Sequence, residues 1–156
     1  MRSSVRPFAL IGLACVIAGG LASAAIAPRP TEHGAWAVAY LVLICGVAQA
    51  ALGAGQGTLA VTPVTPRLVG AELFGWNLGN AAVIAGTLSN THVVVYIGGA
   101  ILVVVLALFV YGVRGSDATD AVVAQASWVV NTFRALVIVL LISIPIGLVL
   151  ATLRKG

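Results

Sequence analysis

The sequence predicts an all-α fold, a polytopic bundle of about five transmembrane helices that forms one domain over residues 1–156. Hydrophobic residues make up 61% of the chain and charged residues 8%, whereas soluble domains are about half apolar and a quarter charged. The mean hydropathy is +1.14. A chain of 156 residues has room for about five spans of roughly 20 residues and for no separate soluble domain. Because a span in lipid must satisfy its own backbone hydrogen bonds, the valine-rich runs indicate helices and not strands.

The first expected helix covers residues 8–27, an unbroken apolar run that follows Arg2 and Arg6. The same pattern is also typical of a secretory signal, because the small residues at 22–24 and 25–27 match cleavage sites. The run is long for a signal core and further spans follow it, so a retained helix is the preferred interpretation. Cleavage near residue 24 would leave four helices and would not change the predictions below.

The second expected helix covers residues 32–58. Pro28 and Pro30 end the first helix, and Thr31 is a typical N-cap with Glu32 in the first turn. At about 100° per residue, the second helix has two faces. One face holds His33, Trp36, Tyr40, Ile44, Val47 and Ala51, and the other holds Cys45, Gln49, Leu52 and Gln56.

The third expected helix covers residues 66–89, begins at Thr65 and Pro66, and should organise the bundle. A stripe about 80° wide carries Glu72, Trp76, Asn80, Val83, Thr87 and Asn90. Small residues run beside this stripe, at Gly75, Gly79, Ala82 and Gly86, and the opposite side holds Phe74, Leu78, Ala81, Ala85 and Leu88. We therefore expect the glycines to face one neighbouring helix and the amides to face another.

Two further helices complete the expected bundle. The fourth covers residues 92–113, is capped by Thr91, and has a packing notch at Gly98 and Gly99. The last covers residues 119–153 and is too long for one upright span, so we expect it to begin at the interface and to be kinked by Pro145. Its first half carries Gln125, Ser127, Asn131 and Arg134.

The positive charges predict how the chain sits in the membrane. Seven arginines and one lysine give a net charge of +4, and all except Arg134 lie in loops or at the ends of apolar runs. This distribution is typical of topology signals and lipid-headgroup contacts, and not of a nucleic-acid-binding face. Counting arginines on each side predicts a multi-pass protein of the cell membrane, with a cytoplasmic N-terminus and an external C-terminus.

The two histidines are one candidate site. His33 and His92 both begin helices that run in the same direction, so we expect them at the same depth near the outer surface. On neighbouring helices they would suit a metal ion or the two faces of a haem b iron, with Tyr40 in a supporting hydrogen bond. A quinone headgroup is a related ligand. The alternative is that both are interfacial residues bonded to headgroups or loops.

The polar residues within the spans form a second candidate site. A charge at membrane depth needs a partner, which predicts an ion pair between Glu72 and Arg134, with Arg67 as a competing partner. The ion pair would act as structural glue, and the functional alternative is a proton or ion path along Glu72, Asn80 and Thr87. The amides should pack across helices or line a path, namely Gln49, Gln56, Asn77 and Asn80.

Several enzyme classes lack their motifs in this sequence. The histidines are superficial and the aspartates share one loop, so no Ser-His-Asp arrangement is expected. Cys15 and Cys45 are isolated in apolar runs and form neither a C-x-x-C motif nor a zinc site. We therefore expect no enzymatic activity and no dedicated metal site.

The runs TEHGAWAVAYLVLICGVAQAALGAGQ (residues 31–56) and WNLGNAAVIAGTL (residues 76–88) resemble those of small uncharacterised integral membrane proteins of high-GC actinobacteria. The abundance of Ala, Val and Gly and the preference for Arg over Lys fit such a source. The resemblance covers about half of the chain. It implies a polytopic membrane protein and brings no activity, cofactor or site residue.

These observations leave three hypotheses for function. The first is a non-enzymatic accessory or assembly subunit of a larger membrane complex, because the small-residue faces exceed what so short a bundle can bury. Its partners would be the lipid bilayer and other membrane subunits or copies of itself. The second is a haem- or quinone-binding redox protein that uses His33 and His92. The third is a small oligomeric transporter or channel.

Overall fold

The computed structural model describes residues 5–60, 64–113 and 131–143, and this part of the chain is helical with short connections. The first two helical units are α1 (Val5–Ile26) and a long second helix made of α2 (Glu32–Tyr40), the π-helix η1 (Leu41–Ala48) and α3 (Gln49–Leu59). They are followed by α4 (Pro66–Leu88), α5 (His92–Val113) and a shorter apolar helix, Asn131–Ser143. The predicted all-α bundle of five helices is confirmed.

Four of these helices are long and apolar enough to cross a membrane: Val5–Ile26, Glu32–Leu59, Pro66–Leu88 and His92–Val113. The protein is therefore a small multi-pass membrane protein. The bounds of these four helices differ from the expected ones by three residues or fewer. Of the expected last helix, 119–153, only residues 131–143 are described, so the interfacial start and the kink at Pro145 lie outside the described residues.

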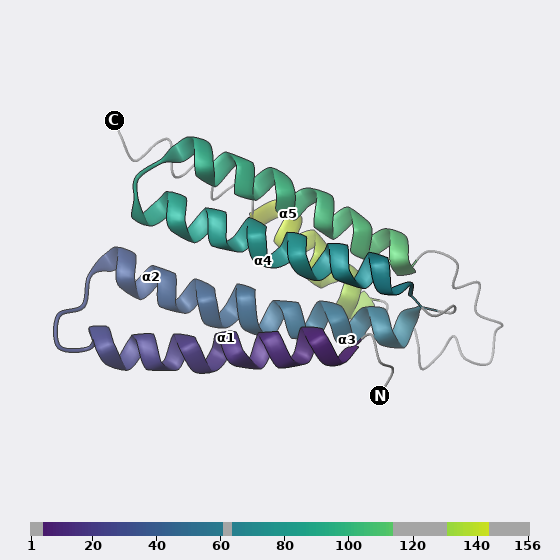
Figure 1. The fold of residues 1–156 in the computed structure, drawn as a ribbon, viewed down its shortest axis with the longest axis horizontal. Helices are drawn as coiled ribbons and strands as arrows, with labels where there is room; N and C mark the ends of the chain where they lie inside the picture. The colour runs from purple at the N-terminus through teal and green to yellow at the C-terminus, as the bar shows by residue number, and fades with distance from the viewer. Residues whose placement is uncertain (1–4, 61–63, 114–130, 144–156) are drawn as a thin grey trace.

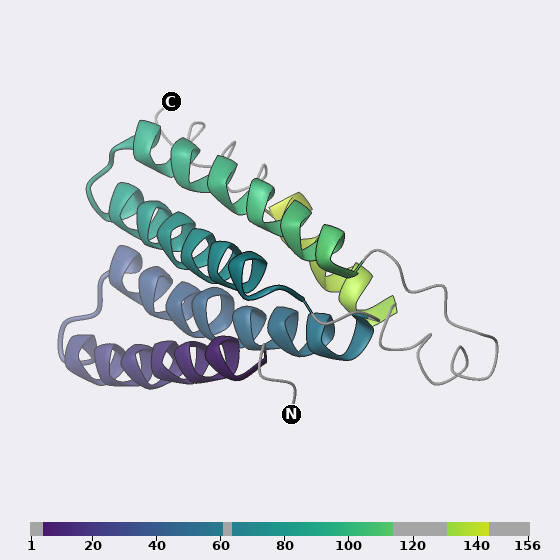
Figure 2. The same ribbon diagram turned by 45° about the vertical axis from the view of Figure 1, so that its right-hand side comes forward.

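The helices lie in the order α1, second helix, α4, α5, each antiparallel to the next (Figures 1 and 2). Thr31 caps the second helix by accepting a hydrogen bond from the Gly34 amide, and Thr65 caps α4 in the same way. Asn90 closes the turn between α4 and α5 with a positive φ of 53°. Asparagine tolerates this left-handed conformation better than most residues do.

Glycine allows α4 and α5 to approach closely. A Cβ atom on Gly98 would lie 2.7 Å from the Gly79 carbonyl oxygen, and one on Gly86 would lie 2.8 Å from the Val95 amide nitrogen. Only a residue without a side chain permits this approach. The predicted packing of the α4 glycines on one neighbour, with a notch at Gly98, is therefore confirmed.

An aromatic cluster fills the centre of the bundle. The Phe8 and Phe109 rings lie 5.4 Å apart, and Trp76 meets Phe109 edge-on at 6.4 Å. All three side chains are buried and join α1, α4 and α5 into one core. The expected outer side of α4 is exposed, with Phe74 at 70%. Exposed apolar side chains are the ordinary state of a surface that meets acyl chains.

Candidate functional site

The polar stripe of α4 is buried against the second helix. Glu72 is 0% exposed, and Trp76 and Asn80 are each 1% exposed. We call the six polar side chains on these facing helices the polar seam: Tyr40, Gln49, Gln56, Glu72, Trp76 and Asn80. The predicted arrangement of α4 is thus found for Asn80, which bonds to the second helix, while Gly75, Gly79 and Gly86 face α5.

The first cross-helix bond of the polar seam joins α2 to α4. The Tyr40 hydroxyl donates to Asn80 Oδ1 at 2.8 Å, and Asn80 Nδ2 donates to the Trp76 carbonyl oxygen at 2.8 Å. The asparagine amide is therefore held by its own helix and presents its oxygen to the neighbour. This contact orients the seam at its α2 end.

The second cross-helix bond joins α3 to α4. Gln56 Nε2 donates to Glu72 Oε1 at 2.6 Å, and both side chains are buried. A Cβ atom on Gly112 would lie 2.6 Å from Gln56 Nε2 and 3.5 Å from Glu72 Oε1, so α5 also borders this pair. Within the described ranges, the second carboxyl oxygen, Glu72 Oε2, has no hydrogen-bond partner. The pair therefore leaves a buried acidic oxygen unsatisfied.

The π-helix η1 explains why Tyr40 and Gln56 bond to the same helix. In a continuous α-helix the step from residue 40 to residue 56 turns the side chain by about 160° net, towards the opposite face. A π-helix closes i→i+5 bonds and so turns by only roughly 80° per residue. The eight π-helical residues of η1 bring Gln56 back to within about 20° of Tyr40. Tyr40 is therefore the exception to the predicted division of the second helix. The rest of the division agrees with the structure, because one face is buried (Cys45, Gln49, Leu52 and Gln56) while Val47 and Ala51 on the other are exposed.

Two more groups of the polar seam are buried without partners. Gln49 is 0% exposed, and neither its Oε1 nor its Nε2 atom has a hydrogen-bond partner among the residues described. The same holds for the indole nitrogen Nε1 of Trp76. Buried polar groups in proteins are nearly always satisfied by protein or by ordered water, so these three atoms are open to a hydrogen bond from water or a ligand.

The predicted Glu72–Arg134 ion pair is not formed. Glu72 is buried and bonded to Gln56, whereas Arg134 and Arg67 are both exposed. The last helix buries the face that carries Phe133, Val137 and Leu140. Arg134 follows Phe133 by one residue, so its side chain points about 100° away from that face. Over residues 5–60, 64–113 and 131–143, the only group bonded to the carboxyl is therefore neutral.

The two histidines lie at the same end of the bundle but are not brought together. They begin α2 and α5, at the left in Figure 1. The helix α4 packs on both α2 and α5 and so separates the two helix starts. His33 is exposed, while His92 is half-buried. Among the described residues no three His, Cys, Asp or Glu side chains are grouped to hold a metal ion. Tyr40, expected beside them, bonds to Asn80 instead.

Two predicted polar residues are satisfied within α4 itself. Asn77 Nδ2 donates to the Leu73 carbonyl oxygen and Thr87 Oγ1 to the Val83 carbonyl oxygen, each at 2.8 Å. Among the described residues Asn77 thus forms no hydrogen bond across helices, and it lies beside the polar seam. Its self-contained bond makes it a suitable control position.

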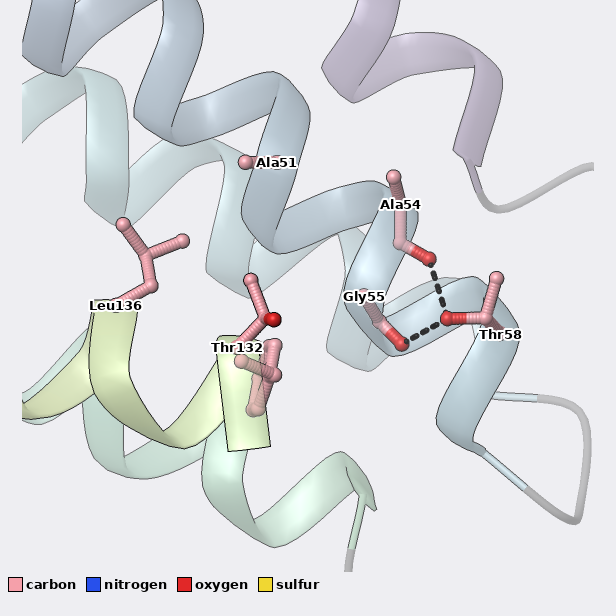
Figure 3. A pocket seen from close by; sticks show the side chains of 7 residues that line it. Ala51, Ala54, Gly55, Thr58, Thr132 and Leu136 are labelled. Atoms are coloured by element: carbon pink, nitrogen blue, oxygen red, sulfur yellow. Dashed lines mark hydrogen bonds between the residues drawn. The ribbon is translucent and has the colours of Figure 1, made fainter. Parts of the chain in front are cut away.

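A pocket of about 280 Å³ lies between α3 and the helix Asn131–Ser143 (Figure 3). The Thr58 hydroxyl at its edge donates to the carbonyl oxygens of Ala54 and Gly55, so it is already satisfied. The described residues that line the pocket include no charged side chain and are small or apolar. The polar seam is therefore the stronger candidate for chemistry.

Comparison with protein-family models, with curated proteins and with solved structures found no match to this chain. The polar seam is accordingly the basis for a functional proposal. The sequence located Glu72, Asn80 and Gln49 but did not pair Gln56 with Glu72. The sequence signal for this pair is the spacing of Gln49 and Gln56, which lie two turns apart on one face of the second helix. Only the structure shows that this face meets the stripe that carries Glu72.

Proposed function

We propose that this protein carries protons or small cations across the membrane, with Glu72 as the group that binds them. The observation that supports the proposal is the state of the Glu72 carboxyl. It is fully buried within a membrane-spanning helix, it accepts one bond from a neutral amide, and no cationic side chain pairs with it among the described residues. Ionisable residues in this position mark ion and proton pathways in membrane proteins.

The chemistry of the Gln56–Glu72 pair suits reversible binding. An unpaired carboxylate in a low-dielectric interior is costly, so it gains a proton or a cation whenever one is available. The Gln56 amide donates to Oε1 in either state, and Oε2 remains open to the bound ion. A lysine or arginine in place of Gln56 would instead neutralise the carboxylate permanently.

The path proposed for the ion follows α4. Glu72, Asn80 and Thr87 succeed one another along this helix, and the first and the last are 15 positions apart. At about 1.5 Å per residue they cover about 22 Å of a hydrocarbon core roughly 30 Å thick. The three polar groups therefore extend over most of the distance that an ion must cross.

Reconstitution into liposomes tests this proposal. Proton and monovalent-cation flux would be followed with internal dyes for wild type, Glu72→Gln and Asn77→Ala. We expect the Glu72→Gln variant to lose the flux, because the amide keeps the shape and the Gln56 bond but cannot take up an ion. Asn77→Ala alters a polar residue beside the seam on the same helix and should retain it. Equal flux in wild type and Glu72→Gln liposomes would overturn the proposal.

The hypothesis of an accessory or assembly subunit stays a prediction. Its basis was the number of small residues, and many of those glycines pack against helices of this same chain, among them Gly12, Gly46, Gly53, Gly79, Gly86 and Gly98. Purification in mild detergent followed by mass spectrometry tests for fixed partners. The haem or quinone hypothesis also stays a prediction, and a visible absorption spectrum of wild type, His33→Ala and His92→Ala tests the haem.

A further inference from the structure

We infer that the polar seam holds a hydrated site between its two cross-helix bonds, and that this site admits water and protons but not metal cations. The inference rests on the proposed function, because it names what passes Glu72. It follows from where the unpartnered atoms lie and from which of them are donors.

The unpartnered atoms of the polar seam lie at one level of the bundle. Gln49 lies between Tyr40 and Gln56 along the second helix, and Trp76 lies one turn from both Glu72 and Asn80 on α4. Since Tyr40 bonds to Asn80 and Gln56 bonds to Glu72, both residues fall at a depth between the two bonds. The unsatisfied groups of the two neighbouring helices thus fall at the same depth of the bundle.

The chemistry of these atoms distinguishes between ligands. Trp76 Nε1 and Gln49 Nε2 are hydrogen-bond donors, whereas Gln49 Oε1 and Glu72 Oε2 are acceptors. Hard metal cations are held by several oxygen ligands, and N–H donors directed at the same place repel them. Water both donates and accepts, and buried waters typically make two to four bonds to such groups.

Hydration also explains how Glu72 would exchange protons. Water bonded to Glu72 Oε2 connects the carboxyl to the region between the two cross-helix bonds. The step is a transfer of one proton from a hydronium ion to Oε2, which leaves water, and its reversal returns the proton to the next water. No oxidant or other reactant is needed, and the Gln56 bond to Oε1 persists throughout.

Solid-state NMR of the labelled full chain in bilayers tests the hydration. Polarisation transferred from water should appear at the Gln49 side-chain amide and the Trp76 indole N–H, and should be absent at Leu106, which is 0% exposed in the apolar core. A loss of the Trp76 signal in Gln49→Leu would support a shared water cluster. Water transfer no greater to Gln49 and Trp76 than to Leu106 would overturn the inference.

Stability measurements give a second readout that does not depend on flux. In a dry seam Gln49 and Trp76 share no partner, so the effects of Gln49→Leu and Trp76→Phe on thermal stability should be additive, whatever the cost of the smaller phenyl ring. With a shared water cluster, each single change strands the remaining groups, and the two effects should be non-additive. Additive effects of the two changes would contradict the hydrated site.

Flux measurements separate this inference from the proposed function. Both the proposed function and this inference are supported if the wild type carries protons but no sodium or potassium, and if the proton flux is lost in Glu72→Gln and in Gln49→Leu. Sodium or potassium flux that depends on Glu72 would keep the proposed function and overturn the inference. Flux independent of Glu72 overturns the proposed function, and the water-transfer experiment then still decides whether the site is hydrated.

Discussion

Tyr40 and Gln56 lie sixteen positions apart on the second helix, yet both donate a hydrogen bond to α4, to Asn80 and to Glu72. The π-helix η1 between them makes this convergence geometrically reasonable, because its smaller turn per residue returns Gln56 to the side of Tyr40. π-Helical turns occur frequently at functional sites. Here the π-helix directs a row of polar side chains towards the helix that carries the buried carboxyl.

Replacing Gln56 with Leu should destabilise the bundle. The change roughly keeps the volume but removes the hydrogen bond that Gln56 donates to the Glu72 carboxyl, which then has no partner among the described residues and remains buried. We expect a loss of about 1–3 kcal/mol, measured by unfolding in detergent. The Asn77→Ala variant serves as a control, since Asn77 bonds only to its own helix among the described residues. An unchanged midpoint for Gln56→Leu would argue against the Gln56–Glu72 bond.

The partner of Glu72 can also be tested by substituting the charges. An amide at position 72 still accepts a bond from Gln56, so Glu72→Gln should leave the unfolding midpoint nearly unchanged. Arg134→Gln should likewise have little effect, because surface charges away from packed groups usually contribute within about 0.5 kcal/mol. A large, matching loss in both variants would instead support the ion pair that the sequence predicted.

Removing the Tyr40 hydroxyl should weaken the contact between α2 and α4. In Tyr40→Phe the ring that packs at 5.1 Å on Trp36 is kept, while the bond to Asn80 is lost. Hydrogen bonds between membrane helices average about 0.6 kcal/mol, so we expect a loss of that order. Tyr111→Phe is the matched control, because Tyr111 is 65% exposed. Equal stability losses in the two variants would show that the Tyr40 bond contributes nothing.

Much of α4 could be predicted from its sequence, and less of its surroundings. The 3.6-residue period places Glu72 and Asn80 on one side and Phe74 on the other, and the structure agrees. The helical period carries no information about which neighbouring helix faces a stripe. The sequence therefore did not predict that Glu72 bonds to Gln56 and not to Arg134. The π-helix was missed as well, because nothing in the composition of residues 41–48 distinguishes it from an α-helix. Its smaller turn per residue changes the face on which Gln56 lies relative to Tyr40.

The contact between α4 and α5 should be intolerant of side chains at Gly98. A Cβ atom there would lie 2.7 Å from the Gly79 carbonyl oxygen and 2.9 Å from the Val83 amide nitrogen. Both are backbone atoms, so Gly98→Ala must push the two helices apart, at a cost of about 1–3 kcal/mol.

Gly70→Ala is the matched control, since a Cβ atom at Gly70 meets nothing within 4 Å. Alanine there should be neutral or stabilise α4 by about 0.5–1 kcal/mol, because glycine loses more backbone freedom in a helix. Unfolding in detergent compares the two variants, and equal midpoints would contradict the close approach of α4 and α5.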